Sequence, residues 1–69
     1  MVRIYLSDRT QLAELQEALR DARCVPVAVG NDVIDVAHPY ALDTREERIE
    51  LTFFLRAWQA ARPGVEVIF

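Results

Sequence analysis

The sequence predicts a single α+β domain, a βαββαβ ferredoxin-like sandwich in which a four-stranded antiparallel sheet carries two helices on one face. Segments of two-residue periodicity alternate with segments of helical periodicity, in the order strand, helix, strand, strand, helix, strand. Right-handed connections between parallel strands restrict this order to few topologies. The chain has only 69 residues, so we expect one domain over residues 1–69.

The first strand and the first helix are separated by a clear change of period. Val2, Ile4 and Leu6 alternate with Arg3 and Tyr5, which predicts a strand that is buried on one face. The following serine and aspartate can cap a helix through their side-chain oxygens. The helix itself is predicted by an apolar stripe at helical spacing, which consists of Leu12, Leu15, Leu19 and Ala22.

A hairpin is predicted next, with strands over residues 24–29 and 33–37. Its apolar side chains are expected to face the core: Val25, Val27, Val29, Ile34 and Val36. Pro26 has no N–H to donate, so the first of these strands is expected at an edge of the sheet. Gly30-Asn31 suits a type II′ turn and Asn31-Asp32 suits a type I′ turn. The two registers differ by two residues, and both stay open.

The second helix and the last strand complete the pattern. Thr44 followed by Glu47 forms a capping box, and Asp43 with Glu46 is a second candidate. The helix is expected to run to about Arg62, before Pro63-Gly64. Residues 65–69 then form a strand with inward side chains at Val65, Val67 and Phe69.

The second helix has more apolar surface than one contact with a sheet needs. One stripe, expected to face the sheet, contains Ile49, Phe53, Ala57 and Ala60. The other contains Leu51, Phe54, Leu55 and Trp58, and it is a candidate interface unless neighbouring elements cover it. Glu50 lies between the stripes, at a solvated edge. The predicted core is Ile4, Leu6, Leu12, Leu15, Leu19, Val27, Val29, Ile34, Val36, Ile49, Phe53 and Val67.

The face of the sheet away from the helices is a second candidate interface. An apolar centre of Tyr5, Val33 and Ile68 is expected there, and a charged rim of Arg3, Asp35 and Glu66 surrounds it. The hairpin would add Cys24, Pro26, Ala28 and Ala37 to this face. An apolar centre with a polar rim is the usual composition of a protein interface.

Composition excludes several classes of protein. A net charge of −3 disfavours binding to nucleic acid, which depends on basic side chains. No segment has the pattern of a signal peptide or a membrane span, so we expect a cytoplasmic protein with no membrane partner. Cys24 is the only cysteine and His38 the only histidine, so neither a disulfide nor a metal site is expected, and no motif indicates a cofactor.

Two groups of residues are candidates for chemistry. Ser7, Asp8 and Arg9 follow the first strand and form a candidate ligand loop. The inferred order of elements resembles amino-acid-binding ACT domains, which implies small-ligand binding at this loop, although the chain lacks their usual glycine there. Cys24 and His38 have no third partner that would make a nucleophile and base. Cys24 is therefore expected to be structural.

The sequence thus predicts a non-enzymatic interaction module, which acts as a homodimer or binds a protein partner. The surplus of apolar surface on so short a chain is the reason. A small-ligand regulatory domain of ACT-like type is the alternative.

Overall fold

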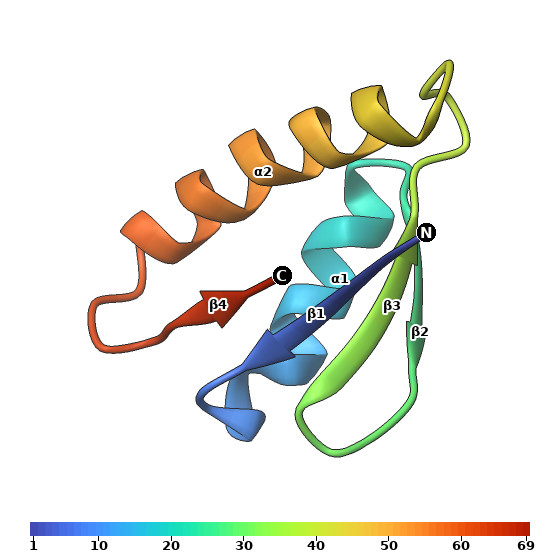
Figure 1. Ribbon diagram of the computed structural model, residues 1–69. Helices are drawn as coiled ribbons and strands as arrows, with labels where there is room; N and C mark the ends of the chain where they lie inside the picture. Colours follow the sequence, from blue (N-terminus) through green and yellow to red (C-terminus); the bar gives the residue numbers. More distant parts are fainter.

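The computed structural model describes residues 1–69 as an α+β fold with one four-stranded antiparallel sheet and two α-helices (Figure 1). The elements in chain order are β1 (Val2–Leu6), the 3₁₀ helix η1 (Arg9–Gln11), α1 (Leu12–Asp21), β2 (Val25–Ala28), β3 (Val33–Ala37), α2 (Thr44–Ala60) and β4 (Val67–Ile68). The strand order in the sheet is β2-β3-β1-β4, and every neighbouring pair is antiparallel. The six elements therefore occur in the predicted order.

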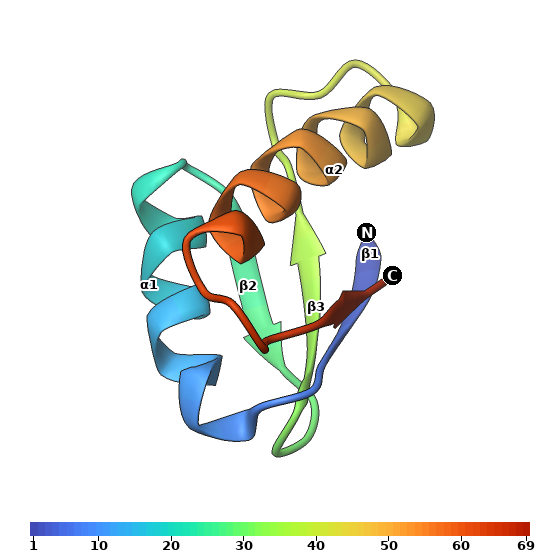
Figure 2. The same cartoon turned by 90° about the vertical axis from the view of Figure 1, so that its left-hand side faces the viewer.

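One core cluster joins both helices to the sheet, and Figure 2 shows the helices alongside the strands. Alternate residues of β1 and β3 are buried, as the two-residue period requires. The cluster has 13 members: Val2, Ile4, Leu6, Leu15, Leu19, Cys24, Ile34, Val36, Leu51, Leu55, Trp58, Val65 and Val67. Leu12, predicted in the core, is only partly buried against it. Most of the predicted core of β1, α1, β3 and β4 is thus confirmed.

Helix α1 is closed at both ends by local hydrogen bonds. The Asp8 carboxylate caps η1 by accepting from the Thr10 N–H at 3.0 Å, as predicted for this loop. At the other end the Cys24 N–H donates to the Leu19 carbonyl, and the Arg23 N–H donates to the Arg20 carbonyl, each at 2.9 Å. This pattern is a Schellman motif. It places Arg23 in the left-handed region, with φ of 65°, where glycine is normally favoured.

The register of the β2–β3 hairpin differs from both predicted registers. Val27 lies opposite Asp35, and the Val29 N–H donates to the Val33 carbonyl, so residues 30–32 form a three-residue loop. Both predictions assumed a two-residue loop. A shift of one residue turns every side chain of a strand to the other face. The predicted burial of Val25, Val27 and Val29 is therefore wrong: all three are exposed, and Pro26 is buried in their place.

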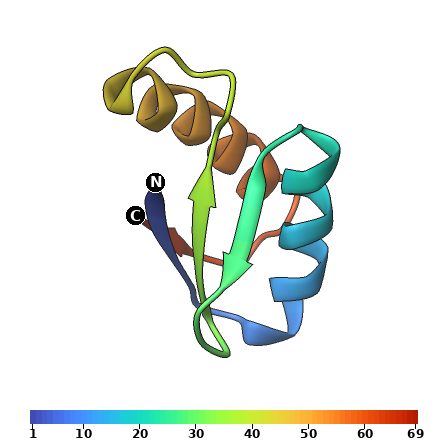
Figure 3. The same cartoon turned by 90° about the vertical axis from the view of Figure 1, so that its right-hand side faces the viewer.

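Strand β2 is an edge strand, as Pro26 predicted, and it lies beside α1 (Figure 3). Antiparallel pairs alternate between hydrogen-bonded and non-hydrogen-bonded positions. Val29 and Val33 form a hydrogen-bonded pair, and two residues along, Val27 and Asp35 form the next one. Pro26, opposite Val36, therefore falls at a non-hydrogen-bonded position. The nitrogen of Pro26 therefore points away from β3, where the sheet loses no bond.

Helix α2 is rotated relative to the prediction. Leu51, Leu55 and Trp58 are buried, whereas Ile49 and Phe53 are exposed, so their assignment to the core is wrong. One polar contact between elements is specific to this rotation: Glu47 of α2 accepts a hydrogen bond from the backbone N–H of His38, just after β3, at 3.0 Å. Glu50 is exposed, as expected.

The termini of α2 also depart from the leading predictions. Asp43 is the N-cap, because its carboxylate accepts from the Glu46 N–H at 2.8 Å, so the second candidate box supplies the cap. The helix ends at Ala60, two residues before the predicted limit. Gly64 has φ of 90°, which allows the chain to turn back toward β4. Neither helix has the length and apolar character that crossing a membrane requires.

Candidate functional site

The open face of the sheet, defined as the side opposite the core, carries a continuous row of apolar side chains. Tyr5 on β1 lies opposite Val33 on β3 and also opposite Ile68 on β4. Val29 continues the row beyond Val33. Tyr5, Val29 and Ile68 expose 48%, 48% and 62% of their surface. We call these four residues the apolar row; it extends from one edge of the sheet to the other.

An ion pair lies beside the apolar row. The Arg3 guanidinium donates two hydrogen bonds to the Asp35 carboxylate, at 2.8 Å from Nε and 3.0 Å from the terminal nitrogen. These bonds from Arg3 hold the pKa of Asp35 below its ordinary value, and the same contact raises the pKa of Arg3. Val27 lies opposite Asp35 on the other side. Arg3 and Asp35 therefore neutralise each other within the chain, whereas Glu66, the third charged residue of the predicted rim, is exposed and forms no ion pair.

The predicted interface residues separate into two groups. Tyr5, Val33 and Ile68 lie together on the open face, since the alternation of β1, β3 and β4 was predicted correctly. Leu51, Leu55 and Trp58 are buried in the core, and Phe54 is partly buried against it. This second stripe is therefore covered by the chain itself and is not an available surface. The hairpin residues expected on the open face, Cys24, Pro26 and Ala28, are replaced there by Val25, Val27 and Val29.

The candidate ligand loop lines an open hollow of about 460 Å³, whose wall also includes Thr10, Asn31 and Asp32. Two of its three residues have structural roles. The Ser7 hydroxyl accepts from the Glu66 N–H at 2.8 Å, and Asp8 caps η1. Bonds from the Thr10 hydroxyl and N–H also lower the pKa of Asp8. Arg9 is exposed, and no apolar side chain lines the hollow.

Cys24 has the environment of a structural thiol. It is buried, and its Sγ makes one weak contact, to the carbonyl of Ala22 at 3.9 Å. Burial raises the pKa of Cys24, and the nearby Glu47 carboxylate raises it further. Both effects disfavour the thiolate, which is the nucleophilic form. No hydrogen bond joins Cys24 to His38.

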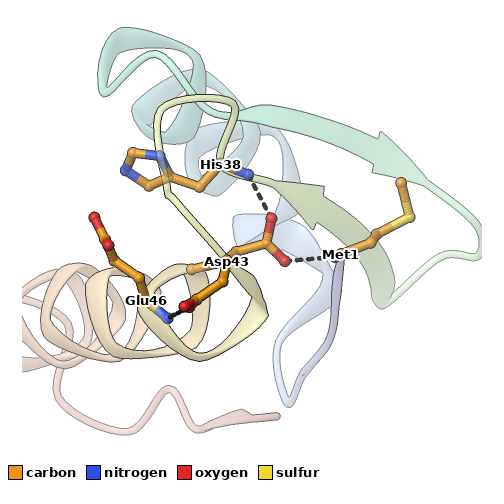
Figure 4. A network of polar contacts seen from close by, with 5 residues as sticks. Met1, His38, Asp43 and Glu46 are labelled. Atoms are coloured by element: carbon orange, nitrogen blue, oxygen red, sulfur yellow. Dashed lines mark hydrogen bonds and ion pairs between the residues drawn. The ribbon is translucent and has the colours of Figure 1, made fainter.

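The Glu47 carboxylate, which the sequence indicated only as the partner of Thr44 in a capping box, is buried at the start of α2; in Figure 4 it is the unlabelled carboxylate between His38 and Met1. Glu47 accepts from the His38 N–H and is ion-paired with the amino group of Met1. The bond from His38 and the pairing with Met1 lower the pKa of Glu47. The sequence indicates the burial of Glu47 only through its position one helical turn before Leu51, on the stripe of α2 that is buried. This network joins β3, α2 and the start of β1, so it is structural.

The chain matches no family model, and no curated protein or solved structure is significantly similar to it. The assignment of a site therefore depends on the surfaces described above. Among the residues singled out from the sequence, those of the open face form the most extended exposed apolar surface.

Proposed function

We propose that this chain is a non-enzymatic interaction module which forms a homodimer through the open face of its sheet. We also propose that its fold is the ferredoxin-like sandwich, with both helices on the opposite side. The strand order β2-β3-β1-β4 supports this topology. It is supported further by the single cluster in which buried residues of both helices meet the inward residues of the strands.

The apolar row is the observation that carries the proposal. It crosses β4, β1 and β3 and ends at Val29, just after β2, without a charged residue, and Val25 and Val27 extend it along β2. Contiguous apolar surface of this kind marks interaction sites on soluble proteins. A two-fold axis that passes through the row sets Tyr5 and Val33 of one copy against the same residues of the other. Such isologous contacts are the commonest way in which identical chains associate.

The ion pair of Arg3 and Asp35 favours a second copy as the occupant. Covering an unpaired charge is costly, but this pair is satisfied before association occurs. Covering the centre of this face therefore isolates neither Arg3 nor Asp35. Glu66 has no ion pair, but it lies next to the edge strand β4, at the rim of the face, where it can stay in solvent.

The size of the face sets the expected affinity. Strands lie ~4.8 Å apart and rise ~3.3 Å per residue, so four strands of up to five residues cover roughly 300 Å² in projection. Two such faces cover roughly 600 Å² in projection, which is below the ~1,000 Å² of a stable specific interface, so the proposal is for a weak dimer. We therefore expect a dissociation constant of about 1–100 μM.

Sedimentation equilibrium between about 5 and 500 μM tests the proposal, since this range brackets the expected dissociation constant. We expect the mass to rise from that of the 7.9 kDa monomer toward twice that value. The double variant Tyr5→Thr/Ile68→Thr keeps strand propensity but removes the only ring and the most exposed side chain of the row, and it should stay monomeric. Phe53→Ala, which removes an exposed ring elsewhere, is the matched control and should still dimerise. A monomer throughout, or a dimer that the double variant leaves intact, contradicts the proposal.

Small-ligand binding at the loop of Ser7, Asp8 and Arg9 is the second candidate, and the hollow of about 460 Å³ favours it. Its polar wall, which includes Asp32 and Arg9, suits a small zwitterion such as an amino acid. Thermal-shift measurements with the twenty amino acids test this candidate. A saturable rise in melting temperature that Arg9→Ala and Asp32→Asn remove would support it; no shift with any of them argues against it.

A further inference from the structure

The outer face of α2 carries basic and apolar side chains that lie outside the core cluster. We define this face by Arg45, Arg48, Ile49, Thr52, Phe53 and Arg56, all of which fall within an arc of about 140° at 3.6 residues per turn. Phe53 exposes 73% of its surface and Ile49 exposes 46%. Five of the six residues line a shallow hollow of about 510 Å³. The face lies outside the core cluster and apart from the apolar row.

The charge on this face is of one sign. Its three arginines form none of the ion pairs within the chain, which join Arg3 to Asp35, Arg62 to Glu14 and the amino group of Met1 to Glu47. At 100° per residue, the glutamates of α2 fall outside the arc. A chain with a net charge of −3 thus presents an uncompensated positive surface at this one helix.

Two of these arginines are held by the last residue of the chain. The guanidinium carbons of Arg48 and Arg56 lie 5.7 Å and 5.2 Å from the centre of the Phe69 ring, within the range of cation–π contact. Gln59 also accepts a hydrogen bond from Arg56 at 3.0 Å. Side chains positioned in this way lose less conformational entropy when they bind a ligand.

We propose that the outer face of α2 is a docking site for an acidic, amphipathic segment of a partner protein. Arginine forks bind carboxylates through paired, charge-assisted hydrogen bonds, which accounts for the three arginines. Ile49 and Phe53 together supply apolar contact for the apolar side of the segment. An inorganic anion needs only the arginines and leaves these two side chains without a role. The negative net charge disfavours nucleic acid as the occupant.

Fluorescence anisotropy with a labelled synthetic peptide tests this proposal. The probe is a peptide of about 16 residues, long enough to form a helix, with leucine at apolar helical spacing and glutamate at the other positions. We expect saturable binding with a dissociation constant in the micromolar range. A second peptide with lysine in place of glutamate should bind at least about tenfold more weakly, since it meets charge of its own sign.

Variants of the outer face identify the site of binding. Arg45→Glu/Arg56→Glu should weaken binding of the acidic peptide by about tenfold or more, and Phe53→Ser by about threefold to tenfold. Arg9→Glu/Arg20→Glu makes the same change in net charge at exposed positions away from α2, and it should change the affinity by less than about twofold. Arg45→Gln/Arg56→Gln removes the charges without reversing them. It replaces the glutamate variant if far-UV circular dichroism shows that the latter is unfolded.

Three outcomes would overturn the proposal. The first is equal binding of the acidic and the basic peptide. The second is an equal loss of affinity in the outer-face variants and in the Arg9/Arg20 control. The third is displacement of the acidic peptide by single-stranded oligothymidylate that binds more tightly through Arg45 and Arg56, which would make the face a nucleic-acid site. Peptide binding should persist in Tyr5→Thr/Ile68→Thr, so it is measured independently of dimerisation.

Discussion

The open face of the sheet and the outer face of α2 both expose apolar side chains, but their charges are arranged in opposite ways. On the open face, Arg3 and Asp35 bind each other through two hydrogen bonds. On the outer face of α2, Arg45, Arg48 and Arg56 have no carboxylate partner in the chain. A face whose central charges are already paired suits an identical copy, whereas a face of one sign needs a partner that brings the other sign.

The largest expected effect is on the free energy of unfolding, and it should differ between substitutions on the two faces of α2. Leu55 is fully buried, so Leu55→Ala should lower the free energy of unfolding by about 2–5 kcal/mol. Phe53 is largely exposed, so Phe53→Ala should lower it by no more than about 0.5 kcal/mol. Urea unfolding followed by circular dichroism measures both values. A comparable loss in Phe53→Ala would mean that this ring is needed for folding, and the outer face would then not be free to bind.

Salt should distinguish the two proposed interfaces. Between about 0.05 and 0.5 M NaCl, the acidic peptide should lose about tenfold in affinity for α2, because screening weakens exposed charge pairs. Dimerisation through the apolar row should change by less than about twofold over the same range, since its contacts are mainly apolar and Arg3 and Asp35 are already paired. Anisotropy and sedimentation measure the two constants. Equal salt dependence would contradict the distinction between a mainly apolar face and a positive face.

Acid should weaken the dimer only at low pH. The hydrogen bonds from Arg3 lower the pKa of Asp35 from its ordinary value of 3.8, so the carboxylate is fully charged above that value. Its pairing with Arg3 is lost only as the pH falls through the lowered pKa. We expect a constant dissociation constant between about pH 5 and 8 and a weaker dimer only when the pH falls below the ordinary pKa of an aspartate. Sedimentation tests this, with circular dichroism at each pH to verify that the chain stays folded.

The smallest expected effect is a change in stability from a substitution at Arg23, and it should leave both interfaces unchanged. Arg23 has a left-handed backbone at the end of α1, a conformation that costs less for glycine. Arg23→Gly should therefore raise the free energy of unfolding by about 0.5 kcal/mol, measured by urea unfolding. Neither dimerisation nor peptide binding should change by more than about twofold, since the residue lies on neither face. A destabilised Arg23→Gly would show that the arginine side chain itself stabilises the turn.

Elements with a single apolar face were predictable from the sequence. Val2, Ile4 and Leu6 alternate with polar neighbours, and Leu15 and Leu19 form the only long apolar stripe of α1, so only one orientation buries them. The part of the open face that depends on β1, β3 and β4 was predictable for the same reason. Tyr5, Val33 and Ile68 therefore lie together as expected.

Elements with two similar faces were not predictable. Both sides of β2 are largely apolar, so its orientation depends on the length of the loop, which the turn residues did not determine. The Leu6 N–H donates to the carbonyl of Asp32 at 2.8 Å, so the pairing of β1 with β3 continues one residue into the loop. The Val29 N–H donates to the Val33 carbonyl, so residues 30–32 form the loop. In α2, two apolar stripes compete, and the stripe that is buried is the one aligned with Glu47, which binds the backbone N–H of His38.

The outward-pointing nitrogen of Pro26 limits how this protein can aggregate. An edge strand with free N–H groups can accept a further strand, and repeated addition produces fibres. At β2, one donor of the exposed edge is missing, and the opposite edge, β4, has only two residues. A further strand could therefore form only a few hydrogen bonds at either edge of the sheet. Concentrated solutions should consequently contain closed, finite assemblies rather than cross-β filaments, even though valine side chains are exposed along β2.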